Sequence, residues 1–88
     1  MSNRRVSGRP VPLLADLTLD QAVESVMRRV AAYQRNRCDV LVDTDGYLRV
    51  MNAYTRRPKV IQPRVKIGSF TRSTPADAVR RAIAEVMK

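Results

Sequence analysis

The most chemically informative part of the sequence is a run of cations without any acid. No Asp or Glu occurs between Asp45 and Asp77, yet seven Arg and Lys residues do. The seven are Arg49, Arg56, Arg57, Lys59, Arg64, Lys66 and Arg72, and the aromatic residues Tyr47, Tyr54 and Phe70 lie among or beside them. Uncompensated cations bind polyanions, because each neutralised nucleic-acid phosphate releases condensed counterions. The stretch therefore predicts a nucleic-acid surface, for which a well-hydrated basic loop is the alternative.

The residues needed for catalysis are scarce. The chain has 88 residues, no His and a single cysteine, Cys38, which excludes Ser-His and Cys-His nucleophile systems and leaves too few ligands for a zinc site. Asp39, Asp43 and Asp45 could hold Mg²⁺ for nuclease chemistry, but no basic-flanked Glu-x-Lys follows, and carboxylates are common in turns. We expect no enzyme activity, no metal site and no cofactor.

The N-terminal residues 1–12 are predicted to form a flexible basic arm, because they are rich in Ser, Asn, Gly, Pro and Arg without apolar periodicity. Within the arm, residues 7–10 read Ser-Gly-Arg-Pro. This is similar to the Gly-Arg-Pro core that lies in AT-rich minor grooves, with Ser7 where the usual arginine stands. Arg4, Arg5 and Arg9 are therefore candidate DNA contacts. A tail without any binding role is the alternative.

Two helices and three strands must position these residues. Thr18 to about Gln34 is predicted as a helix, opened by a Thr18–Gln21 capping box and stabilised by a Glu24–Arg28 pair. Residues 38–42 and 47–53 are predicted as a β-hairpin around an Asp-Thr-Asp-Gly turn, and residues 64–70 as a third strand. The second helix is predicted over residues 74–87, with Thr74 as its cap and Pro75 in its first position.

These elements predict a single small α+β domain over residues 13–88. Its order is helix, three-stranded antiparallel sheet, helix (αβββα), and we expect the helices to cover one face; a sheet sandwiched between the helices is the alternative. The inward position of each periodic pattern gives the expected core. This core consists of Val26, Val30, Val40, Val42, Leu48, Val50, Val65, Ile67, Val79 and Ile83. Cys38 is expected to be a buried small hydrophobe.

Residues 64–70 read Arg-Val-Lys-Ile-Gly-Ser-Phe and precede a helix that contains Ala78 and Val79. This pattern resembles the end of the ethylene-response-factor type DNA-binding domain and of the arm-type DNA-binding domains of tyrosine integrases, over about residues 40–88. The resemblance implies a three-stranded sheet whose open face enters the DNA major groove. It places Arg64 and Lys66 outward on the last strand and Tyr47 and Arg49 outward on the middle strand. It also makes Gly68 the tight strand exit and Phe70 the anchor of the helix. The cap at Thr74 comes two residues later than in those families, whose minimal domain has no counterpart of the first helix.

Two functions follow from these observations. The first is a small basic protein that binds DNA, or else RNA, as a regulator or recombination accessory factor. The predicted contacts are Tyr47, Arg49, Arg56, Arg57, Lys59, Arg64 and Lys66, with Arg4, Arg5 and Arg9 of the arm. The second is a protein-interaction module, such as an adaptor or inhibitor of the kind that phages encode, which binds an acidic or nucleoprotein partner or a second copy of itself through an outward apolar strip of Leu41, Tyr47 and Met51.

The net charge of +9 fits either function. With one cysteine, no apolar run of membrane-spanning length and no hydrophobic stretch after the first arginines, the sequence predicts a cytoplasmic protein without a membrane partner.

Overall fold

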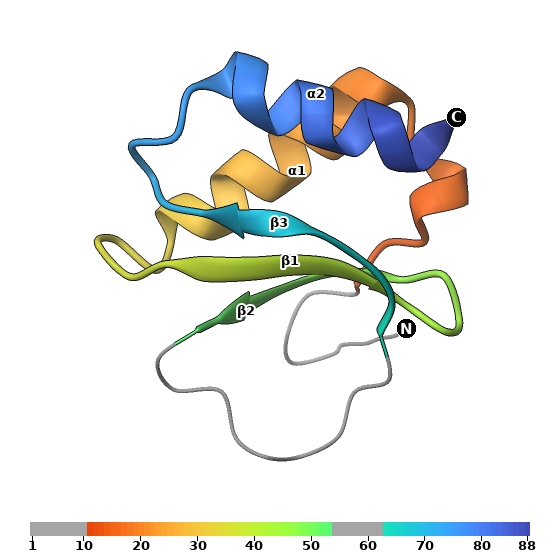
Figure 1. Cartoon of the computed structure of the whole chain (residues 1–88), viewed down its shortest axis with the longest axis horizontal. Helices are drawn as coiled ribbons and strands as arrows, with labels where there is room; N and C mark the ends of the chain where they lie inside the picture. The colour runs from red at the N-terminus through yellow and green to blue at the C-terminus, as the bar shows by residue number, and fades with distance from the viewer. Residues whose placement is uncertain (1–10, 54–62) are drawn as a thin grey trace, which may run out of the picture.

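The predicted order of helices and strands is confirmed in a computed structural model, which describes residues 11–53 and 63–88 (Figure 1). The elements are the short 3-10 helix η1 (Leu14–Asp16), α1 (Leu19–Ala31), β1 (Cys38–Asp43), β2 (Leu48–Asn52), β3 (Pro63–Phe70) and α2 (Ala76–Met87). The three strands form one antiparallel sheet, so the α+β class is confirmed.

The strand order differs from a simple succession of hairpins. The order is β2-β1-β3, which places β1 in the centre and puts Tyr47 and Arg49 at an edge strand, not on the middle strand as expected. The outer edge of β2 is in use at its start: Leu48 N–H donates to Pro12 O (2.9 Å), and Leu13 forms an isolated bridge with Tyr47. The third strand pairs with the other edge of β1.

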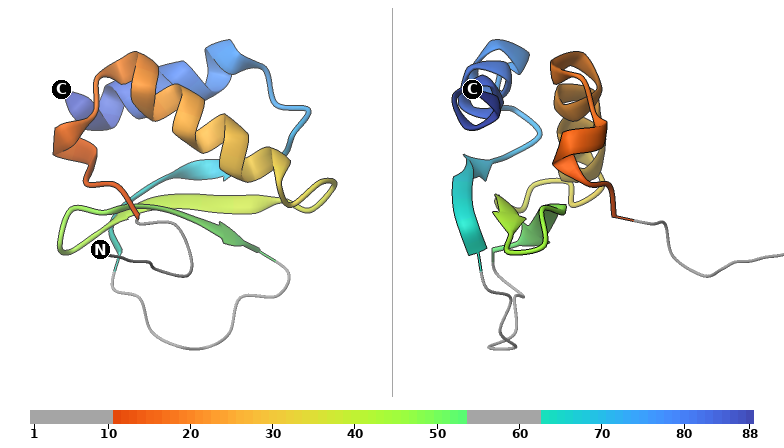
Figure 2. Two further views of the ribbon diagram at one scale, coloured as in Figure 1. Left: turned by 180° about the vertical axis from the view of Figure 1, so that it is seen from behind. Right: turned by 90° about the vertical axis from the view of Figure 1, so that its right-hand side faces the viewer.

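Both helices lie on the same face of the sheet (Figures 1 and 2). Between the helices and the sheet lies a core of buried side chains. Its members are Ala22, Val23, Val26, Val30, Cys38, Val40, Val42, Leu48, Phe70, Val79 and Ile83, with Val50 and Ile67 packed against them. The burial of Cys38 is thus confirmed.

One predicted core position is wrong, because Val65 is 37% exposed. A register shift between Val40 and Leu41 interrupts the β1–β3 pairing, so Ile67 has no partner in the register and Val65 lies opposite Val42. Strict alternation breaks at this irregularity. Val65 still shares the face of the buried Val42, so its exposure reflects its place on the edge strand β3 and not its side of the sheet.

Phe70 owes its place in the core to a glycine. A Cβ atom at Gly68 would lie only 2.9 Å from Cζ of Phe70, so the ring packs over a position that no larger residue could occupy without a shift. The resemblance implied that Gly68 forms the exit from β3, but Gly68 lies inside this strand, which ends at Phe70.

The predicted start of α1 is confirmed and that of α2 is wrong. Thr18 and Gln21 form both hydrogen bonds of a capping box. At the second helix, Pro75 is the N-cap, because the Thr74 hydroxyl instead accepts a hydrogen bond from Thr71 N–H (3.0 Å).

The end of α1 also differs from expectation. The helix ends at Ala31, three residues before the predicted Gln34, which has a positive φ of 59°. The expected Glu24–Arg28 ion pair does not form; both side chains are exposed.

Val42→Asp tests this register. Val42 is 4% exposed and lies opposite Leu48, so an aspartate there would bury a charge without a partner. Since a small domain is stable by only about 5–15 kcal/mol, we expect the variant to lose cooperative unfolding in urea. Val65→Asp, in the same row of the sheet, is the matched control and should unfold with a midpoint close to that of the wild type. An unchanged midpoint for Val42→Asp would refute the register.

Candidate nucleic-acid interface

The face of the sheet that points away from the helices is organised by the carboxylate of Asp43. Its Oδ1 accepts hydrogen bonds from the backbone N–H groups of Asp45 (2.9 Å) and Tyr47 (3.0 Å). Its Oδ2 accepts from Nε of Arg49 (2.8 Å). Gly46, with a φ of +93°, allows the chain to turn between these donors. One carboxylate thus fixes both the β1–β2 turn and the direction of Arg49.

Asp43 stays ionised in this setting. Burial alone would raise its pKa, since its side chain is 7% exposed. The hydrogen bonds from Tyr47, Arg49 and Asp45 and the charge of Arg49 outweigh that effect and lower the pKa below the ordinary value of 3.8. The Asp43–Arg49 ion pair is therefore present at neutral pH.

Arg49 keeps donors for a ligand. Its hydrogen bond to Asp43 uses Nε, and a guanidinium has further N–H donors on its two terminal nitrogens. The side chain is 35% exposed, and its guanidinium carbon lies 5.7 Å from the centre of the Tyr47 ring. Arg49 is thus held between a carboxylate and an aromatic ring, and part of its guanidinium group is exposed to solvent.

A second buried carboxylate, Asp39, organises the β3 side of the same face. The Ser69 hydroxyl donates to Oδ1 of Asp39 (2.7 Å), and Nζ of Lys66 lies 3.7 Å from that oxygen. The Lys66 side chain is 58% exposed, so this pair is loose and the ammonium stays accessible. Beside it, burial and then the charge of Asp39 raise the pKa of the Cys38 thiol, which keeps the thiol protonated.

The structure places some of the predicted contacts and not others. Tyr47, Arg49 and Lys66 lie on the same face as Asp39 and Asp43, as the strand register requires. The remaining predicted contacts are Arg64, for which only the backbone in β3 is described, and Arg56, Arg57, Lys59, Arg4, Arg5 and Arg9, which lie outside the described residues.

The sequence did not lead us to predict that Asp39 and Asp43 pair with Lys66 and Arg49. Asp39 and Asp43 share one side of β1, and the hairpin register puts Arg49 across from Leu41, next to Asp43. The position of Arg49 in the hairpin register, beside Asp43, was the sequence signal from which the Asp43–Arg49 ion pair could have been predicted. The outward apolar strip was only partly correct, because Leu41 is 6% exposed and hence buried, while Tyr47 and Met51 are half-buried.

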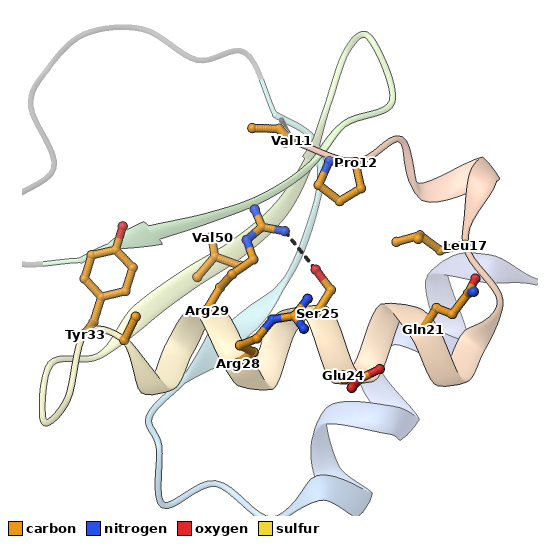
Figure 3. A pocket seen from close by; sticks show the side chains of 11 residues that line it. Val11, Pro12, Leu17, Gln21, Glu24, Ser25, Arg28, Arg29, Tyr33 and Val50 are labelled. Carbon is orange, nitrogen blue, oxygen red and sulfur yellow. Dashed lines mark hydrogen bonds between the residues drawn. The ribbon is translucent and has the colours of Figure 1, made fainter. Parts of the chain in front are cut away.

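A groove of about 620 Å³ lies between α1 and the outer edge of β2 (Figure 3). It is lined by Val11, Pro12, Leu17, Gln21, Glu24, Ser25, Arg28, Arg29, Ala32, Tyr33 and Val50. Arg29 reaches across it, donating from Nη1 to the Ser25 hydroxyl (3.2 Å) and from Nη2 to Leu48 O (2.8 Å). Pro12, which accepts from Leu48 N–H, has no N–H of its own, so Arg29 supplies the donor that Leu48 O needs.

Comparison of the chain with protein-family models, curated proteins and solved structures finds no match in any of the three. Within residues 11–53 and 63–88, no three or more His, Cys, Asp or Glu side chains cluster in a way that could hold a metal ion. No helix in that part of the chain is long and apolar enough to cross a membrane.

Replacing Asp43 by Asn tests the charge network through pH. The folded pKa of Asp43 is lowered, so its ionisation stabilises the fold above the ordinary value of 3.8, and this contribution is lost as pH falls through the folded pKa. We expect the wild type to lose stability from about pH 5 downward, and Asp43→Asn to be less stable at pH 7 with a flatter pH profile. Urea unfolding at several pH values measures both.

Asp45→Asn is the matched control, since it lies in the same turn, is exposed and forms no ion pair within the described part of the chain. Its profile should follow that of the wild type. Parallel profiles for the wild type and Asp43→Asn would contradict the assigned role of Asp43.

Proposed function

We propose that this protein binds nucleic acid, with duplex DNA as the first candidate, through the face of the sheet that points away from its helices. The observation that carries the proposal is the arrangement of layers. Both helices lie on one side, and the other side presents Arg49, Lys66 and Tyr47 from the two edge strands. A groove or strand of nucleic acid can approach that side without displacing a helix.

The two cations suit different parts of a nucleic acid. Arg49 is oriented by Asp43, and an oriented guanidinium can donate two parallel hydrogen bonds to a guanine edge in the major groove. Lys66 is more exposed and only loosely paired, which suits contact with a phosphate. Arg56, Arg57, Lys59 and Arg64 of the basic stretch and Arg4, Arg5 and Arg9 of the N-terminal segment belong to the same proposal as further phosphate contacts.

The role proposed is binding, without catalysis or a cofactor. A regulator or recombination accessory factor in the cytoplasm fits a small cationic domain of this kind. The chemistry of phosphate contacts is shared by DNA and RNA, so the experiment below compares duplex DNA with duplex RNA.

The test is a fluorescence-anisotropy titration of labelled duplexes over a series of salt concentrations. If Arg56 and Arg57 each neutralise a phosphate, the Arg56→Ala/Arg57→Ala variant should flatten the slope of log affinity against log salt by about two, since each contact contributes about 0.9 on duplex DNA. Sequence preference should hardly change, because phosphates carry no sequence information.

The oriented arginine should behave differently. In a competition between duplexes that differ at one base pair, Arg49→Ala should reduce discrimination by about 1–3 kcal/mol at a single position. Arg80→Ala is the control: Arg80 lies on α2, in the helix layer, and pairs with Asp20. If the wild type bound neither duplex DNA nor duplex RNA at low salt, nucleic-acid binding would be refuted. If Arg49→Ala left the discrimination between base pairs unchanged, the role of Arg49 in base recognition would be refuted.

One observation favours a second candidate, a protein-interaction module. The β1–β2 ladder is flanked by two hydrogen bonds, from Asp43 N–H to Tyr47 O and from Ala53 N–H to Arg37 O. Hydrogen-bonded and non-hydrogen-bonded residue pairs alternate between them, so the N–H and C=O of Val50 point away from β1. These two groups have no partner in the described part of the chain, and they border the groove beside α1. Arg28, exposed and without an ion pair in that same part, stands at the groove as well. The fitting occupant is an extended acidic segment of another protein, added as a strand at Val50.

Hydrogen exchange tests this edge. The Val50 amide should exchange rapidly in the free protein, while the amides of Arg49 and Met51, which face β1, should be protected. A blocked peptide of alternating Val and Glu should slow exchange at Val50, and Arg28→Glu should weaken that effect. A peptide of alternating Val and Lys is the matched control. Protection of Val50 in the free protein, or equal effects of the two peptides, would rule out this occupant.

A further inference from the structure

One end of the sheet gathers arginines that lie far apart in the sequence. Cys38, the first residue of β1, pairs with Phe70, the last residue of β3. The connection from α1 to β1 and the connection from β3 to α2 therefore meet at the same end of the domain (Figures 1 and 2). Arg35 and Arg37 lie on the first connection and Arg72 on the second. These three residues are named the arginine end.

The charges of the arginine end are uncompensated. All three side chains are exposed, and none forms an ion pair or side-chain hydrogen bond within residues 11–53 and 63–88. The two connections, residues 32–37 and 71–75, contain no Asp or Glu. The cations of the sheet face differ in this respect, since Arg49 and Lys66 each lie beside a carboxylate.

The backbone that carries these arginines is held by local hydrogen bonds. In the second connection, Thr74 N–H donates to Thr71 O (3.0 Å) and Ser73 N–H donates to the Thr71 hydroxyl (3.2 Å). In the first, Asn36 N–H donates to Tyr33 O (3.1 Å). A fixed backbone lowers the entropy lost when a ligand orders the side chains. The arginine end thus combines free cations with a preformed frame.

The strand β2 also ends at the arginine end. Ala53 N–H donates to Arg37 O (2.8 Å), so the chain leaves β2 beside the arginine end. A polyanion that lies along the sheet face toward this end would meet the oriented Arg49 on the face and the free arginines at the end. Each phosphate that such a cation neutralises releases counterions condensed on the nucleic acid.

We propose that Arg35, Arg37 and Arg72 form a phosphodiester-backbone site that anchors the nucleic acid at the end of the sheet, separate from recognition by Arg49. The inference rests on the proposed nucleic-acid function and deepens it. Among the described residues, the arginine end is proposed to supply most of the sequence-independent affinity for nucleic acid.

The experiment compares two triple variants that lose the same charge. The first is Arg35→Gln/Arg37→Gln/Arg72→Gln. The second is Arg80→Gln/Arg81→Gln/Lys88→Gln, which removes three exposed cations from α2 and from the residue that follows it. Both sets are exposed, so circular dichroism and urea unfolding should match the wild type. Affinity for a labelled DNA duplex is then measured over a series of salt concentrations.

We expect the arginine-end variant to reduce the slope of log affinity against log salt by about 2.7, which is about 0.9 for each lost phosphate contact. The helix variant should keep a slope within about one of the wild type, and discrimination between duplexes should persist in both variants. If the wild type binds but its slope survives in the arginine-end variant, or if both variants flatten the slope equally, the anchoring site is refuted while nucleic-acid binding stands. A wild type that binds no duplex refutes both proposals.

Discussion

The rest of the structure depends on the burial of β1 along its whole length. All six residues of this central strand are buried, including Asp39 and Asp43 on the face away from the helices. A buried carboxylate is costly unless it is paired and hydrogen-bonded. The sequence meets this requirement with groups from both neighbours: Arg49 and the turn amides for Asp43, and Ser69 with the looser Lys66 for Asp39. The central strand therefore binds its edges through side chains as well as through the backbone ladder.

This constraint divides the cations of the domain into two kinds. Arg49 and Lys66 serve the fold first, and what they offer a ligand is the part of each side chain that the carboxylates leave exposed. Five exposed arginines pair with no carboxylate within the described residues: Arg28, Arg35, Arg37, Arg72 and Arg81. Net charge alone cannot make this distinction, because it counts an arginine held against a carboxylate like one that stands free. The proposed division of labour between an oriented arginine and a set of free ones follows from it.

Local patterns predicted the elements of the fold, and long-range contacts decided what those patterns could not reach. Periodicity and capping chemistry located α1, and the Asp-Gly turn located the hairpin, because each signal lies within a few adjacent residues. The outer edge of β2 is occupied at Leu48 by Pro12 and Arg29, which lie 36 and 19 residues before Leu48 in the sequence. Val65 lies opposite the buried Val42 but on the edge strand β3, and its exposure there is something that alternation along one strand cannot anticipate.

The candidate site follows the same rule. Tyr47, Arg49 and Lys66 were placed on one face correctly, because strand alternation suffices for that. Their carboxylate partners required the register across β1, which a hairpin of known turn length already contains. The arginine end was out of reach, since it joins residues 35–37 with residue 72 through the pairing of Cys38 with Phe70. Only the non-consecutive pairing of β1 with β3 brings these segments together.

The two kinds of cation should also respond differently to salt. An ion pair whose carboxylate is 7% exposed is screened less than charges that are separated by solvent. Asp43 therefore continues to orient Arg49 at salt concentrations at which free arginines have lost much of their attraction to phosphates. Affinity carried by the arginine end would fall steeply with salt, whereas discrimination carried by Arg49 would persist for as long as a complex can be measured. Under the proposed function, such a domain would separate the affinity for a nucleic acid from its recognition, because the fold pairs Arg49 with a carboxylate and leaves Arg35, Arg37 and Arg72 without an ion pair among the described residues.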